Sequence, residues 1–129
     1  MNKIIVEVSV GELLDKISIL EIKKDKIKDP EKLKFISNEH SILLDQLKKN
    51  VKSDEKLQKL FQELEDITAK PCVIEDAKRD CEKNKDFGEK FIKLSRDVHF
   101  LNDDRAKIKL EINNLTGSSI KEIKEYTSY

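Results

Sequence analysis

Glu21 and Arg105 are the two residues of this chain whose charge and position best suit specific recognition or chemistry. Both occupy apolar positions of helical repeats: Glu21 follows Ile17 by four residues, and Arg105 follows Leu101 by the same spacing. An isolated charge inside a protein is strongly unfavourable, so a buried carboxylate and a buried guanidinium are expected to pair. Such a pair either fixes the alignment of two helices or forms the floor of a ligand site.

The ligand alternative has a definite chemistry. Arg105 would bind the carboxylate or phosphate of an anionic small molecule through two parallel hydrogen bonds. Lys24 and Asn102 lie within one helical turn of the pair and would support it. The candidate ligand-binding set is therefore Glu21, Lys24, Asn102 and Arg105. Two further alternatives are a different helix alignment and an Arg105 side chain that extends outward into water.

A second polar group consists of Glu75, Asp76 and Arg96. Arg96 is expected near Glu75 across a helical hairpin. We interpret this group as surface ion pairs, each contributing less than ~1 kcal/mol.

Metal binding is not expected. Asp103 and Asp104 are adjacent in a predicted helix, so their carboxylates point in different directions. His40 and His99 lie at different depths of the predicted fold and cannot share one ion. His40 lies within an apolar repeat, so we expect it to be a packed core histidine.

Composition excludes several function classes. The 129 residues include 26 basic and 26 acidic ones, and only 5% are aromatic, so neither nucleic acid nor an anionic membrane is an expected partner. No apolar run suits a signal peptide or membrane span, so we expect a cytoplasmic protein. Cys72 and Cys81 are nine residues apart on one predicted helix and should stay free thiols. Known catalytic motifs are missing, so no catalytic residue or cofactor is predicted.

Apolar residues recur at alternating spacings of three and four through most of the chain, which predicts an all-α protein with a coiled-coil-like seam. Capping signals at Ser9, Asp29, Asp54 and Asp86 divide this pattern. The predicted helices span about 10–28, 30–50, 54–83 and 87–115. Gly117 is the expected left-handed C-cap of the fourth helix, and the interior Pro71 is expected to kink the third.

Short connections favour an antiparallel up-down-up-down four-helix bundle, a single domain over 1–129 with a long C-terminal helical hairpin. Residues 1–8 are expected to form a short extended segment, rich in Ile and Val as a strand would be, that lies along the bundle or pairs with another copy. Residues 118–129 are expected to form a tail with one possible turn at Ile120–Ile123. Counting outward from each turn predicts which residues of neighbouring helices lie at the same height in the bundle. Glu21 is expected beside Ile36, Ile36 beside Ile67 or Thr68, and these two beside Arg105. The first helix is apolar around much of its circumference and should be the most buried.

Several segments together resemble a known family. The most specific are Val8–Lys23, with the sequence VSVGELLDKISILEIK, and Asn102–Ala106, with the sequence NDDRA. Weaker matches are Ile74–Asp76, Phe91–Leu94 with Arg96, Gly117–Ser118 and Ser128–Tyr129. The chain resembles small bacterial and phage proteins classified as a domain of unknown function. Cys72 and His99 stand where aromatic residues are usual in that family, and Pro71 is atypical.

The resemblance implies no established activity, although some members occur in surface-polysaccharide or glycosyltransferase contexts. We therefore expect a noncatalytic helical interaction or assembly module that self-associates or docks on a partner protein. The alternative is a small helical enzyme or anionic-ligand-binding protein, or a surface-polysaccharide biosynthesis accessory. Glu12–Leu20 loosely resembles the opening helix of all-helical chorismate mutases, although their early arginines are missing here.

Overall fold

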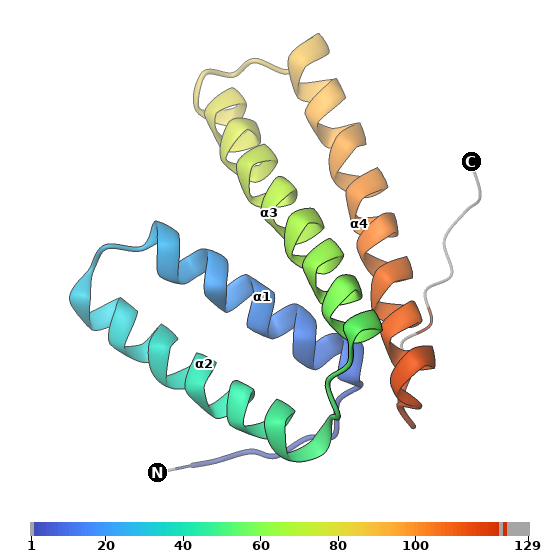
Figure 1. Ribbon diagram of the computed structural model, residues 1–129. Coiled ribbons are helices and arrows are strands. Elements are labelled where there is room, and N and C mark those ends of the chain that lie inside the picture. The colour runs from blue at the N-terminus through green and yellow to red at the C-terminus, as the bar shows by residue number, and fades with distance from the viewer. Residues whose placement is uncertain (1, 122, 124–129) are drawn as a thin grey trace.

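The computed structural model describes residues 2–121 and residue 123, and these form four helices and no strand (Figure 1). The helices are α1 (Val10–Lys26), α2 (Pro30–Asn50), α3 (Glu55–Lys83) and α4 (Glu89–Thr116). The prediction of an all-α four-helix bundle is confirmed. None of these helices is long and apolar enough to cross a membrane.

Local capping explains most helix boundaries. The Ser9 hydroxyl accepts a hydrogen bond from the backbone amide of Glu12, and the carboxylates of Asp29 and Asp54 cap α2 and α3 in a similar way. Gly117 ends α4 in the left-handed region, with φ 67°, as predicted. Helix α3 continues through Pro71.

The start of α4 differs from the prediction. Its N-cap is Gly88, which makes no side-chain cap, so the predicted capping role of Asp86 is wrong. The carboxylate of Asp86, two residues before this N-cap, instead accepts a hydrogen bond from the Gly88 amide.

The predicted extended N-terminal segment is present, but it forms no strand within the described chain. Residues 2–8 are extended but unpaired, because no neighbouring strand exists in the described chain to take their backbone hydrogen bonds. Ile4 and Ile5 are 87% and 84% exposed. The predicted turn at Ile120–Ile123 and the terminal tyrosines lie wholly or partly outside the described residues.

Helix α1 lies at the centre of the bundle. It packs against α2, α3 and α4, whereas α2 approaches closely only α1 (Figure 1). As predicted, α1 has the most buried residues of the four helices. The core cluster consists of Leu14, Ile17, Leu57, Leu64, Ile108 and Ile112.

The two hairpins, α1–α2 and α3–α4, meet at one end and diverge toward their turns (Figure 1). The distal half of the α3–α4 hairpin therefore extends past the shared core. Beyond Thr68 on α3 and before Ile108 on α4, Cys81 is the one buried residue of these two helices. The hairpin relies there on contacts between its own two helices.

Candidate functional site

Arg105 lies in a nearly buried ion pair, but its partner is Asp15 and not Glu21. The guanidinium of Arg105 donates from Nε to Oδ1 of Asp15 at 2.6 Å and from a terminal nitrogen to Oδ2 at 2.5 Å. The side chains of Asp15 and Arg105 are 4% and 26% exposed. Hydrogen bonding to Asp15 raises the pKa of Arg105, opposed by burial. This two-point contact holds both groups in one plane.

The sequence-based pairing of Glu21 with Arg105 is wrong for a geometric reason. The prediction derived the alignment of α1 with α4 from the successive pairs α1–α2, α2–α3 and α3–α4. It assumed that each helix packs against the next one in the chain. Helix α2 does not closely approach α3 or α4, and α1 packs directly on α4. The alignment of α1 with α4 is thus independent of α2. Arg105 meets α1 six residues before Glu21, about 9 Å along the helix.

A second ion pair extends this contact toward the start of α1. Lys109 Nζ donates to Oε2 of Glu12 at 2.6 Å, and Lys16 lies 3.9 Å from the same carboxylate. A small open cavity of about 200 Å³ lies over the two pairs and is also bordered by Asn102. Its two carboxylates and two cationic groups compensate one another. An anionic ligand would have to displace Asp15 or Glu12 to reach a cation.

The predicted ligand set is therefore divided in space. Asn102 and Arg105 border the cavity between α1 and α4. Glu21 borders a different groove, between α1 and α3, and Lys24 is exposed on α1. Glu21 Oε1 lies 3.4 Å from Nε2 of His40, which is buried as predicted.

The first turn of α1 is sealed against α4 by polar side chains. Its three free amides, at Val10, Gly11 and Glu12, donate to Ser118 Oγ, Asn113 Oδ1 and Ser9 Oγ respectively. These groups are the usual anion-binding donors of a helix N-terminus. Here protein side chains satisfy them all, so this end of α1 is a structural joint.

Gly11 makes this joint possible by its lack of a side chain. A Cβ atom added to Gly11 would lie 2.5 Å from the carbonyl oxygen of Lys109 and 3.0 Å from Asn113 Oδ1. Sequence reasoning missed Gly11 and Asn113. The available signal was a glycine in the first turn of a helix. Glycine has a low helix propensity, so its presence there indicates that another backbone packs closely against it.

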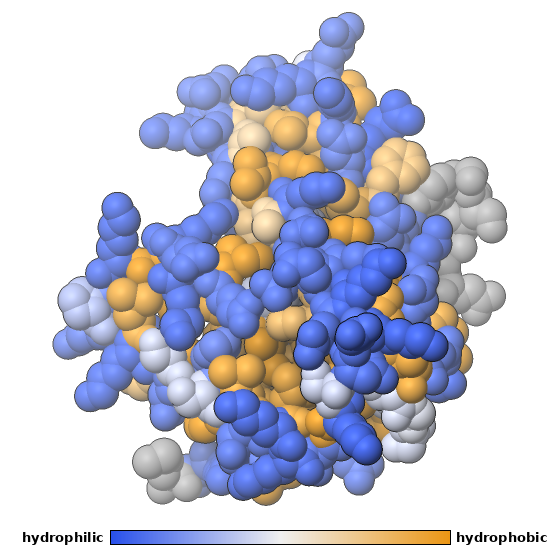
Figure 2. Space-filling model, in the orientation of Figure 1, coloured by the Kyte–Doolittle hydropathy of each residue, from blue (hydrophilic) through white to orange (hydrophobic). Residues whose placement is uncertain are grey.

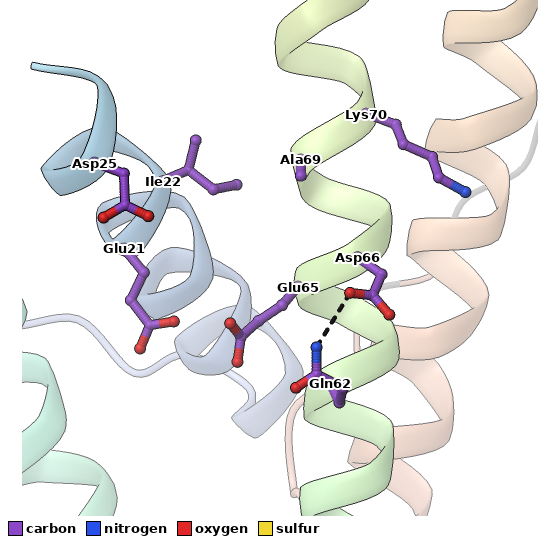
Figure 3. Close-up of a pocket in the computed structure, with 8 residues that line it drawn as sticks. All are labelled: Glu21, Ile22, Asp25, Gln62, Glu65, Asp66, Ala69 and Lys70. Carbon is purple, nitrogen blue, oxygen red and sulfur yellow. Dashed lines mark hydrogen bonds between the residues drawn. The ribbon is translucent and has the colours of Figure 1, made fainter.

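The groove between α1 and α3 carries an unusual concentration of carboxylates (Figure 3). It has a volume of about 570 Å³ and is lined by Glu21, Ile22, Asp25, Gln62, Glu65, Asp66, Ala69 and Lys70. The side chains of Glu21 and Glu65 point toward one another across it (Figure 3). Burial, a hydrogen bond with Glu21 and the charges of Glu21 and Asp66 raise the pKa of Glu65 to about 7. Glu65 is thus about half protonated at neutral pH.

The second predicted polar group does not form one cluster. Glu75 lies 3.9 Å from Lys78 on its own helix, and Asp76 lies 3.9 Å from Lys26 of α1. Within the described residues, Arg96 makes no ion pair with either carboxylate. These are exposed surface pairs of the weak kind that the sequence predicts. Across residues 2–121 and 123, no group of three or more ligating side chains is placed to hold a metal ion.

An apolar groove lies between α3 and α4 in the distal half of their hairpin. It has a volume of about 480 Å³ and is lined by Lys70, Val73, Ile74, Asp97, Phe100 and Leu101. Val73 and Phe100 belong to the exposed large apolar residues of the chain. Figure 2 shows that hydrophobic atoms reach the surface over this hairpin on the side facing the viewer, among charged side chains. Four of its six lining residues, Val73, Ile74, Phe100 and Leu101, are apolar.

Comparison with known proteins identifies the family. The sequence model of a family of unknown function, DUF6165, matches residues 4–129. The chain belongs to this family. The resemblance to a domain of unknown function is thus confirmed, and the matched region includes the exposed segment that begins at Ile4. No curated protein and no solved structure matches the DUF6165 chain significantly.

Proposed function

We propose that this chain is a noncatalytic protein-interaction module that docks a protein partner on the distal half of the α3–α4 hairpin. The observation that supports this most directly is the apolar groove lined by Val73, Ile74, Phe100 and Leu101. A two-helix hairpin cannot bury both faces of its helices, because each helix has only one neighbour there. Covering such a face is the usual source of stability in helix-in-groove and helix-bundle contacts.

The form of the groove also suits a protein partner. Its lining is mostly aliphatic and aromatic, with one cationic and one anionic residue, Lys70 and Asp97, on opposite helices. An apolar centre with a polar rim is the typical anatomy of a protein interface. Its lining residues include no cysteine, histidine, serine or threonine, and the role we propose is binding without chemistry.

The anionic-ligand alternative has weaker support. Arg105 and Lys109 already contact Asp15 and Glu12 at hydrogen-bonding distance. A ligand there would have to replace two charge-assisted contacts, each stronger than an ordinary hydrogen bond. We therefore rank small-molecule binding, and the chorismate-mutase-like and polysaccharide-accessory roles, below protein docking.

Site-specific photo-crosslinking in living cells tests the proposal. A photoreactive phenylalanine analogue at Phe100 should give discrete protein adducts after irradiation, because that side chain borders the groove. The matched control places the same analogue at Phe35 of α2, which is 76% exposed but lies outside the groove. Adding Val73→Glu to the Phe100 variant should abolish its adducts while leaving the thermal unfolding midpoint unchanged.

Two results would refute the proposed function. Either the Phe100 position yields no protein adduct, or Phe100 and Phe35 yield the same adducts with equal efficiency. The adduct mass then identifies the kind of partner. Twice the mass of the chain indicates a second copy, and any other mass indicates a different protein.

A further inference from the structure

The exposed N-terminal segment, residues 3–7, has a pattern that matches the apolar groove. Figure 1 draws this segment as an elongated stretch outside any helix or strand, and in an extended chain alternate side chains project to the same side. Lys3, Ile5 and Glu7 therefore share one face, with an apolar residue between a cation and an anion. Ile5 is 84% exposed, an unfavourable state for a large aliphatic side chain.

The groove presents the complementary arrangement. Val73 and Phe100 border an apolar centre, Asp97 lies on the α4 side, and Lys70 lies on the α3 side. Within the described part of the chain, neither Lys70 nor Asp97 forms an ion pair. Two charges that lack partners, on either side of an apolar depression, are the pattern that a segment with the opposite charges would satisfy.

The dimensions of segment and groove agree. Lys3 and Glu7 are four residues apart, so their Cα atoms are about 13 Å apart in an extended chain. Packed helices have axes about 8–10 Å apart, and the side chains of Lys70 and Asp97 add reach on either side. A segment that crosses the hairpin would place Ile5 over the apolar centre, Lys3 beside Asp97 and Glu7 beside Lys70.

The segment of the same chain is badly placed to fill this groove. The first turn of α1 is tied to Asn113, and the segment leaves α1 past the end of α2, away from the α3–α4 turn (Figure 1). Asp97 is sixteen residues from Asn113, about 24 Å along α4. Eight residues from Gly11 to Lys3 span at most about 28 Å. Docking within one chain would require a reversed, almost fully stretched segment.

We propose that residues 3–7 of one copy bind across the α3–α4 groove of a second copy, with Ile5 inserted between Lys3–Asp97 and Glu7–Lys70 ion pairs. This inference rests on the proposed function and names the partner as the chain itself. The family match begins at residue 4, so most of the segment belongs to the matched domain. Reciprocal exchange between two copies gives a closed dimer, and one-way binding gives a chain of subunits.

Analytical ultracentrifugation of the full chain over a range of concentrations tests this geometry. The wild type should show concentration-dependent association. Ile5→Asp should abolish it, whereas Ile4→Asp should preserve it, because Ile4 is equally exposed but projects from the opposite face. Neither residue is part of the core, so circular dichroism should show the same helical content in both variants.

A charge exchange gives a second, independent readout. Lys3→Glu should weaken association roughly tenfold by placing two carboxylates together, and Asp97→Lys should do the same with two cations. The double variant should recover most of the wild-type affinity. A mixture of the Ile5→Asp and Val73→Glu chains should also associate, because one brings an intact groove and the other an intact segment.

Several outcomes would overturn the inference. These are a wild type that stays monomeric at all concentrations, equal effects of Ile4→Asp and Ile5→Asp, and a double charge variant no better than the single ones. The proposed function would survive them if the Phe100 position still yields adducts with a different protein. Loss of both the adducts and the association would remove both proposals.

Discussion

The Asp15–Arg105 ion pair predicts an unequal response to removing either partner. In Arg105→Met, the Asp15 carboxylate keeps its charge at a position that is 4% exposed and loses both strong hydrogen bonds. Removing one member of a buried pair typically costs about 3–5 kcal/mol. In Asp15→Leu, Arg105 is 26% exposed and can turn its guanidinium toward water, so its cost should lie at or below the lower end of that range.

The double variant Asp15→Leu/Arg105→Met should be close to wild type or more stable, since it leaves no unpaired buried charge and replaces the ion pair with apolar side chains. Urea unfolding followed by far-UV circular dichroism gives the free energy of unfolding of all four proteins. The coupling energy from this double-mutant cycle should be several kcal/mol. For a chain of this size, a loss of 3 kcal/mol corresponds to a fall of roughly 10 °C in Tm.

The matched control is the cycle between Glu21→Leu and Arg105→Met. Glu21 is about 9 Å further along α1 than Asp15, so the two effects should add to within about 0.5 kcal/mol. The reasoning fails if Arg105→Met unfolds within about 0.5 kcal/mol of wild type. It also fails if Glu21 couples to Arg105 as strongly as Asp15 does.

Two further predictions concern the joint and the acidic groove. Gly11→Ala should destabilise the fold by about 1–3 kcal/mol in urea unfolding, because its Cβ would meet the Lys109 carbonyl at 2.5 Å. Gly88→Ala, whose Cβ would meet one side-chain atom at 3.5 Å, should change stability by less than about 1 kcal/mol, and equal effects would contradict the close contact at Gly11. Because the pKa of Glu65 is raised, the folded chain binds more protons than the unfolded chain between pH 4.5 and about 7. The contribution of Glu65 to the free energy of unfolding should therefore fall as the pH rises through that range. Glu65→Gln should flatten this part of a pH series of urea midpoints, and an unchanged slope would assign it to other groups.

The sequence predicts the helices well because their signals are local. The spacing of apolar residues and the caps at Ser9, Asp29 and Asp54 depend only on residues a few positions away. All four helices lie within about two residues of their predicted ends. The failure at Asp86 is instructive, because a carboxylate at the right spacing was engaged in the loop instead.

The candidate site was predicted only in part, because its geometry is not local. Arg105 was correctly singled out as a charged residue in an apolar repeat, but its partner depends on how the two hairpins cross. Asp15 lies outside the apolar repeat of α1 and reads as a surface residue. It is buried because α1 has neighbours on three sides, so more than its apolar stripe is covered. Periodicity within one helix carries no information about that.

The joint of α1 with α4 and the two grooves differ in which of their groups remain unsatisfied. The joint of α1 with α4 is closed, because its charges and first-turn amides contact one another at hydrogen-bonding distance. The acidic groove partly relieves its own repulsion by protonating Glu65. The α3–α4 groove differs, because Val73 and Phe100 in its lining are exposed to water. Its charged residues, Lys70 and Asp97, have no ion-pair partner among the described residues. Burying the exposed Val73 and Phe100 side chains against another chain would be favourable, because it removes apolar surface from water. For this reason we propose the hairpin, and not the joint with its more conspicuous charges, as the interaction surface.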